Sequence, residues 1–333
     1  MISPHKGINY DTGFEPYGPA NSSRKTFDTE VVRREMQIIA ADLHCTHIRI
    51  TGAHADRMAT AARLAIEAGL SVWFSPFPCN LTADELVHYL VDCATKAEEI
   101  RLISADTVLV LGCELSLFNN GFLPGNHLLE RTQAFPQFEK WQPAMDEKLN
   151  LFFHDAVPQV RQCFNGNITY AAGEWEEIDW SLFDIVSVDL YRAKHNHVYY
   201  AHQLKAYMAH NKPVAVTEFG CCAVRSGAEM GGNATFQILS FQDDRLVVNE
   251  DWQYSEDEQV AYLQELFATF TAAGIAHAFW FSFADYEKPY SDVPKYNLDM
   301  ASYGLVQVLN HYGKTYPDMQ WEPRKAFWAI SKI

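Results

Sequence analysis

The sequence has little positive charge for its length. Its 333 residues include 26 lysines and arginines against 42 aspartates and glutamates, which gives a formal net charge of −16 at pH 7. Proteins that bind nucleic-acid phosphates need a basic surface, and anionic membranes and polyanionic substrates attract the same charge. The composition therefore predicts no nucleic-acid partner and no membrane partner, and it leaves neutral small molecules open as ligands.

Long hydrophobic runs are also missing. No segment reaches the roughly 18 uninterrupted apolar residues that span a bilayer, and residues 1–7 lack the apolar core of a signal peptide. The seven cysteines are odd in number and show no C-x-x-C spacing, which disfavours a disulfide framework and a zinc site. These features predict a cytoplasmic protein with reduced cysteines, and they carry no signal for an oligomeric state.

Linkers rich in glycine, serine or proline are absent, and the chain instead alternates between two patterns. Short apolar runs, mostly β-branched or aromatic, lie at 6–11, 47–52, 71–77, 107–114, 168–175, 185–192, 213–220 and 275–283. Such runs are typical of parallel strands covered by helices. Eightfold alternation predicts an α/β fold, a (β/α)8 barrel. An open doubly wound sheet is the rival, but no G-x-G-x-x-G turn follows the first run.

Helices are predicted between the runs, at 28–42, 54–68, 82–103, 143–163, 199–210 and 255–273, with a short one at 178–183 and a last one at 322–333. Asp28 and the Thr82–Glu85 pair stand at N-cap and capping-box positions. The surplus length falls at 115–141, 221–254 and 284–321, after the fourth, seventh and eighth strands. One barrel over residues 1–333, with long loops on its C-terminal face, explains the length better than two domains.

Polar residues gather where the apolar runs end. They are Glu114, Glu174, Asp189, Tyr191 and Glu218, and the second run carries Arg49. A carboxylate at the end of an apolar run is costly to bury unless it is paired or used. The fourth and seventh strands face each other across a barrel mouth, so we expect Glu114 and Glu218 to converge there.

The strand ends resemble those of the clan A glycoside hydrolases, the retaining (β/α)8 glycosidases that include mannanases and cellulases. Leu111-Gly-Cys-Glu114 resembles the clan's Gly-Asn-Glu ending of strand four, and Val216-Thr-Glu-Phe-Gly220 resembles its strand-seven ending. Ala278-Phe-Trp-Phe-Ser282 is similar to its strand-eight segment. The resemblance covers about residues 6–283. It implies hydrolysis of O-glycosidic bonds in a neutral carbohydrate, with no cofactor and no metal.

The resemblance also implies roles for individual residues. Glu114 corresponds to the acid/base and Glu218 to the nucleophile, with Arg49 near the nucleophile and Tyr191 bonded to it. Trp280 corresponds to the tryptophan under the sugar. Retention requires two carboxyl groups about 5–5.5 Å apart. Apolar surroundings and the charge of Glu218 are expected to raise the pKa of Glu114, as suits an acid.

Cys113 departs from the clan's pattern. An asparagine that holds the sugar 2-hydroxyl usually occupies this position, and a thiol is a poor donor. Cys113 is retained as a predicted substrate contact, and so are Glu174 and Asp285 near the rim. The other two glutamates of the 173–177 run are predicted to be the solvated start of a helix.

Two alternatives stay open. One is a barrel that binds carbohydrate without turnover, which the cysteine at 113 favours. The other is a metal-dependent barrel of the sugar-isomerase type, with Glu114, Glu174, Asp189 and Glu218 as oxygen ligands. The pair of histidines at 195 and 197 is predicted to lie in a loop after the sixth strand, where substrate contact or solvation is expected instead of zinc.

Overall fold

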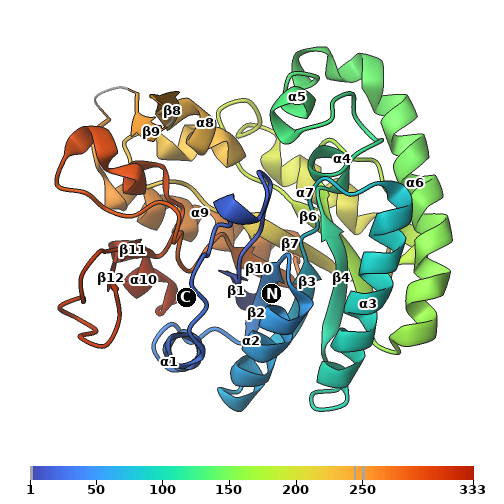
Figure 1. Ribbon diagram of the computed structural model, residues 1–333, viewed down its shortest axis with the longest axis horizontal. Helices are drawn as coiled ribbons and strands as arrows, with labels where there is room; N and C mark the ends of the chain where they lie inside the picture. Colours follow the sequence, from blue (N-terminus) through green and yellow to red (C-terminus); the bar gives the residue numbers. More distant parts are fainter. Residues whose placement is uncertain (1–2, 244, 250–251) are drawn as a thin grey trace.

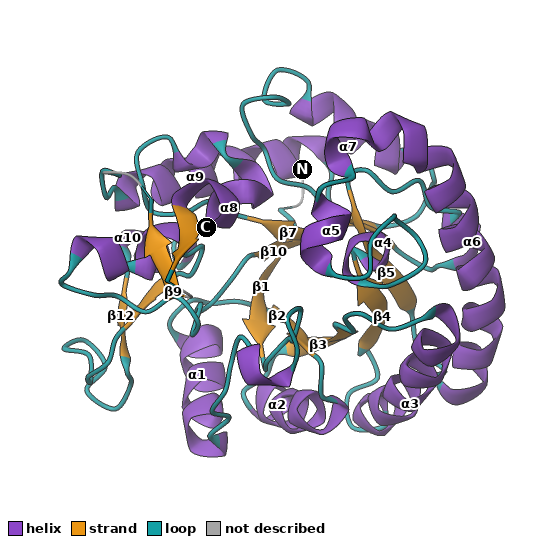
Figure 2. Ribbon diagram, turned by 45° about the horizontal axis from the view of Figure 1, so that its top comes forward, coloured by secondary structure: helices purple, strands orange, loops and turns teal. Residues whose placement is uncertain are grey.

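The computed structural model describes residues 3–243, 245–249 and 252–333, and its centre is a closed barrel of parallel strands (Figures 1 and 2). The strands are β1 (His5–Asp11), β2 (His47–Gly52), β3 (Ser71–Pro76), β4 (Val108–Cys113), β5 (Ile168–Gly173), β6 (Val186–Asp189), β7 (Val214–Phe219) and β10 (His277–Trp280). They follow one another around the barrel, and β10 closes it against β1. The predicted (β/α)8 fold is confirmed, and each predicted run matches one of these strands, with β1 beginning one residue before its run.

Helices surround the strands (Figure 2). The main ones are α1 (Thr29–Ala41), α2 (Ala55–Glu67), α3 (Ala83–Arg101), α6 (Phe138–Cys163), α7 (Tyr200–Met208) and α9 (Glu256–Ala273). Asp28 accepts from the backbone N of Glu30 at 2.9 Å, and Thr82 forms a capping box with Glu85. Both predicted caps are therefore present and begin their helices as expected.

Three predicted helices differ from the structure: α6 begins at Phe138 and not at the predicted residue 143, and the other two are shorter than predicted. The 178–183 stretch forms only the 3-10 turn Trp180–Leu182. The last helix, α10, is short (Lys325–Ile330), because Trp321–Pro323 pairs as β12 with β11 (Val306–Val308). Pairing with a distant segment takes these residues out of the helix predicted from 322 onward.

The rim segments follow β4, β7 and β10, and so lie on the C-terminal side of the barrel. The first contains α4 (Leu115–Phe118) and α5 (Leu128–Thr132). The second contains α8 (Ala234–Ile238) and the hairpin of β8 (Leu239–Gln242) with β9 (Arg245–Val248). Residues 244 and 250–251 of the predicted 221–254 segment lie outside the described residues. An apolar cluster that includes Met230, Ile238, Met300 and Tyr303 joins the second and third segments.

Different side chains fill the barrel and the layer under its helices, because successive residues of a strand point to opposite faces. Trp73, Val110 and Phe279 belong to the interior cluster. Ala278 and Trp280, on either side of Phe279, belong to the outer cluster. In the described part of the chain, no helix is both long enough and apolar enough to cross a membrane.

Candidate active site

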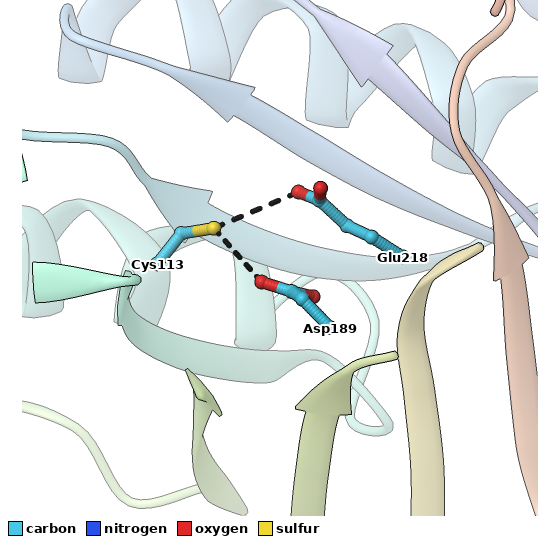
Figure 3. A group of neighbouring side chains, drawn as sticks. All are labelled: Cys113, Asp189 and Glu218. Carbon is cyan, nitrogen blue, oxygen red and sulfur yellow. Dashed lines mark hydrogen bonds between the residues drawn. The ribbon is translucent and has the colours of Figure 1, made fainter. Parts of the chain in front are cut away.

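The middle of β2 and the carboxyl ends of β4, β6 and β7 bring four polar side chains together. They are Arg49, Cys113, Asp189 and Glu218, and each has 7% or less of its surface exposed. Figure 3 shows the sulfur of Cys113 directed at the carboxyl groups of both Asp189 and Glu218. Elements separated by more than 150 residues thus build one buried cluster.

Two irregularities in the strands make this convergence possible. The pairing of β4 with β5 shifts register between Val110 and Cys113, so both residues face the interior although they are three positions apart. Gly112 lies within the shift at φ 91°, a conformation that favours glycine. A second shift, between β6 and β7, places Asp189 opposite Glu218. β-Bulges commonly redirect side chains beside active sites, and these two turn Cys113 and Glu218 toward Asp189.

Glu218 is held by donors on both of its carboxyl oxygens. Arg49 Nη1 donates to Glu218 Oε1 at 2.8 Å, and the Tyr191 hydroxyl donates to Oε2 at 2.9 Å. Arg49 is held in turn by Asn9 Oδ1 at 3.1 Å and by Ser75 Oγ, 3.0 Å from Nε. The contacts expected of Arg49 and Tyr191 are present, and they fix the orientation of the carboxylate.

Glu114 follows β4 directly and takes a left-handed backbone conformation, with φ 44° and ψ 45°. Burial raises the pKa of its carboxyl well above the usual range, and three nearby carboxylates act in the same direction. They belong to Asp189, Glu218 and Glu176, and Arg49 offsets them only in part. Burial and the neighbouring carboxylates therefore both favour the protonated form of the Glu114 carboxyl group.

Cys113 and Asp189 form a hydrogen-bonded pair. The thiol donates to Asp189 Oδ2 at 3.1 Å and lies 3.6 Å from Glu218 Oε1. Burial raises the pKa of Cys113 well above its usual value, so the sulfur is a donor and not a thiolate nucleophile. Cys113 is only 1% exposed and packs beneath the mouth. It was predicted to contact the substrate, and its burial contradicts that prediction.

Cys113, Asp189 and Glu218 also form a group that could hold a metal ion. In the described part of the chain, no other set of three or more His, Cys, Asp or Glu residues brings its ligand atoms within 4.8 Å of one another. The donor set of this group suits hydrogen bonding better than metal binding. The Glu218 oxygen nearest the thiol already accepts from Arg49, and the thiol is protonated. Glu174 lies apart with its side chain 31% exposed, 3.4 Å from His195 Nε2, so the four carboxylates of the isomerase alternative do not converge.

Two residues predicted to contact the substrate, Trp280 and Asp285, are buried and hydrogen-bonded to the backbone of Tyr303. Trp280 is fully buried, and its Nε1 donates to the backbone O of Tyr303 at 3.0 Å. It packs against Phe219 in the outer cluster and offers no face to a sugar. Asp285 is 8% exposed and accepts from the backbone N of Tyr303 at 3.0 Å, so it anchors the segment after β10. The prediction for Trp280 is wrong because the strand turns its ring into the outer cluster, whereas a substrate contact of Asp285 stays a prediction.

Phe281 is a further aromatic residue near Tyr191, and the sequence patterns do not single it out. It is half-buried and lies one position beyond Trp280. Its ring centroid is 6.4 Å from that of Tyr191, which bonds Glu218, and 5.8 Å from that of Tyr303. Phe281 lies just beyond β10 and packs against the rim cluster, and the continuously apolar run 275–283 contains no signal that distinguishes it from Trp280.

Comparisons with known proteins give matches only at the level of structure: no protein-family model and no curated protein sequence matches the chain. A GH113 β-1,4-mannanase superposes with a TM-score of 0.61 at 14% identity, over 100% of this chain and 99% of that one. Thermotoga maritima Cel5A, in complex with mannotriose, gives 0.51 at 14% identity, over 89% of this chain and 96% of that one.

A third match is the β-glucuronidase from Ruminococcus gnavus, with a TM-score of 0.57 at 14% identity. It covers 100% of this chain, which spans 49% of the length of that protein. At such low identity the likeness establishes a common fold. The chain therefore shares the (β/α)8 barrel of these glycoside hydrolases, as the resemblance of its strand ends predicted.

Proposed function

We propose that this protein hydrolyses the O-glycosidic bond of a neutral sugar by double displacement, with Glu218 as the nucleophile and Glu114 as the acid/base. One observation carries the proposal: a carboxylate held by Arg49 and Tyr191 shares the barrel mouth with a carboxyl group whose pKa is strongly raised. Retaining glycosidases need one ionised carboxylate that attacks the sugar and one protonated carboxyl group that donates a proton to the leaving oxygen. We expect the two groups to lie about 5–5.5 Å apart.

In the first step, an oxygen of Glu218 forms a bond to the anomeric carbon while the bond from that carbon to the leaving oxygen breaks. Glu114 gives its proton to the leaving oxygen, which departs as an alcohol. The product is a glycosyl ester of Glu218. Since Arg49 and Tyr191 hold the two oxygens of Glu218 in place, the attacking atom needs little rearrangement.

In the second step, Glu114 takes a proton from water, whose oxygen attacks the anomeric carbon and displaces Glu218. The change of role follows from electrostatics. The negative charge of Glu218 is one cause of the raised pKa of Glu114, and this charge disappears when the ester forms. The pKa of Glu114 therefore falls when a base is needed, and it rises again when Glu218 is released.

A neutral sugar fits the charges and the aromatic residues at the mouth. Lys288, a buried cation on the segment after β10, is bound to Glu287 at 2.8 Å and lies 3.7 Å from Asp285, so its charge is already matched. Phe281 and Tyr191 offer aromatic surface beside Glu218. Such surface suits the apolar C–H faces of a sugar ring, and the negative net charge disfavours a uronate.

A barrel that binds sugar without hydrolysing it is the second candidate. The observation in its favour is the thiol at position 113, which is buried and bonded to Asp189 and leaves no amide donor there for a sugar hydroxyl. In that case the protein would bind a glycoside and leave it intact.

Incubation with dinitrophenyl β-mannoside and β-glucoside, followed by proton NMR, separates these functions. Hydrolysis that first releases the β-anomer supports the proposal, and release of the α-anomer would replace it with an inverting mechanism. Glu218→Gln should abolish turnover, whereas Glu229→Gln, an exposed rim residue, should not. Calorimetric binding of mannotriose without turnover of any glycoside would favour the binding barrel.

A further inference from the structure

The loop after β5 carries a buried carboxylate that the proposed mechanism does not use. Glu176 is only 6% exposed, although its neighbours Glu174 and Glu177 are exposed. The prediction that it would be a solvated residue at the start of a helix is wrong, because its side chain turns inward and finds hydrogen-bond donors there. Burying a carboxylate is costly, so the partners of Glu176 indicate what it does.

Each oxygen of Glu176 accepts two hydrogen bonds. Oε1 accepts from the backbone N of Ser116 at 3.1 Å and from the hydroxyl of Ser116 at 2.5 Å. Oε2 accepts from the Tyr170 hydroxyl at 2.7 Å and from the backbone N of Gly173 at 2.9 Å. Glu176 thus ties the segment that follows β4 to the end of β5.

Tyr170 extends this connection to the residue next to Glu114. Its hydroxyl donates to Glu176 and accepts from the backbone N of Leu115 at 2.7 Å. The backbone N–H groups of Leu115 and Ser116, the two residues after Glu114, are therefore both bound by the Glu176 network.

The backbone at Glu114 needs such support. Its left-handed conformation is uncommon for a residue with a side chain and persists only where the surroundings hold it. Its own backbone N donates to Ala171 O at 2.9 Å, so three successive N–H groups have fixed partners. This stretch of backbone decides where the Glu114 carboxyl points.

We propose that Glu176 is a positioning residue for Glu114: through Ser116 and Tyr170 it holds the backbone that directs the Glu114 carboxyl at the leaving oxygen. The inference rests on the proposed function, because the task it assigns belongs to the proton-transfer step. Glu176 does not contact the reacting atoms and acts only through Glu114.

The charge of Glu176 also affects the pKa of Glu114. Burial raises the pKa of Glu176 to about 7, against the hydrogen bonds from Ser116 and Tyr170 that lower it. When ionised, it is one of the carboxylates that raise the pKa of Glu114. Removing this charge lowers the pKa of Glu114, so Glu114 loses its proton at a lower pH.

Glu176→Gln tests both influences, because an amide nitrogen accepts no hydrogen bond and carries no charge. We expect kcat/KM for alkyl glycosides to fall about 10- to 100-fold, and that for dinitrophenyl glycosides to fall no more than about threefold, since only poor leaving groups need a well-placed acid. The basic limb of the pH–rate profile should move to lower pH. Glu177→Gln, the exposed neighbour, is the matched control and should change neither.

Tyr170→Phe separates position from charge. It frees the backbone N of Leu115 but leaves the carboxylate of Glu176 in the protein. We expect the same dependence on the leaving group, with a smaller movement of the basic limb than in Glu176→Gln. This variant also keeps the inference testable if Glu176→Gln does not fold.

Equal losses on both substrate classes with an unmoved basic limb, in folded variants, would show that Glu176 serves stability alone and would overturn the inference. If the wild-type protein hydrolyses no glycoside, the proposed function fails instead. Carbon-13 NMR titration then still tests the network, with Glu114→Gln used for assignment. The pKa of Glu114 should be lower in Glu176→Gln than in Glu177→Gln, and equal values would contradict the coupling.

Discussion

Replacing Asp189 by asparagine should stabilise the protein at alkaline pH and leave its stability nearly unchanged at acidic pH. Asp189 is 2% exposed, and its ion pair with Arg49 is long, at 3.7 Å. The same nitrogen of Arg49 donates to Glu218 at 2.8 Å, so Asp189 receives the weaker share of the positive charge. The Cys113 thiol is a weak donor and compensates little.

The size of this stabilisation follows from the pKa of Asp189. Burial and the charge of Glu218 raise the pKa of Asp189 from 3.8 to about 7. Because one pKa unit is worth about 1.4 kcal/mol, ionised Asp189 costs the folded state about 4 kcal/mol. A group whose pKa is raised by folding contributes stability that is complete below pH ~4 and is lost as the pH rises through about 7.

Asparagine resembles the protonated aspartic acid at every pH. The difference in free energy of unfolding between Asp189→Asn and the wild type should therefore grow from near zero at pH ~4 to about 4 kcal/mol at pH ~8. Urea denaturation at constant ionic strength measures it. Asp92→Asn, on the exposed side of α3, controls for the loss of one negative charge. A difference that stays flat over this range, or a less stable variant at pH ~8, would refute the reasoning.

Three further predictions concern the site. Glu218→Ala should lose activity by orders of magnitude, and azide should restore part of it with a product of inverted anomeric configuration. Glu114→Ala should still cleave substrates with good leaving groups, and azide should rescue its deglycosylation with the anomeric configuration retained. NMR of the products measures both outcomes. Identical behaviour of the two variants would contradict their roles. Cys113→Asn should cost about 1–3 kcal/mol, measured by urea denaturation, because one amide group is buried without a full set of partners; unchanged stability would mean that the site has room for an amide. Phe281→Ala should raise KM with little loss of stability, whereas Trp280→Phe should lower the melting temperature and leave KM unchanged, and the reverse pattern would place Trp280 at the substrate.

Local pattern was enough to predict the elements of the barrel. Each apolar run matches a strand, and the caps at Asp28 and Thr82 begin helices, because both signals act over a few residues. The resemblance of the strand ends to those of the clan A glycoside hydrolases also implied that Arg49 lies near Glu218, and this contact is present.

Side-chain direction could not be predicted from the same pattern. Whether Trp280 or Phe281 faces the mouth depends on the parity of β10, and a continuously apolar run gives no parity. The bulge at Gly112 that turns Cys113 inward exists only in the pairing of β4 with β5. In the acidic run 173–177, nothing distinguished Glu176 from its exposed neighbours.

The sequence by itself determined the barrel, the order of its strands and the side chains available at their ends, because periodicity and capping are properties of neighbouring residues. Only the tertiary structure decided which of those side chains meet. Arg49 selects Glu218 over Asp189, and Cys113 is bonded beneath the mouth. Glu176 is buried behind Glu114 because Ser116 and Tyr170, 60 and 6 residues away, supply donors there. These contacts depend on burial, strand register and charge, which involve residues from different elements, so the local sequence pattern does not predict them.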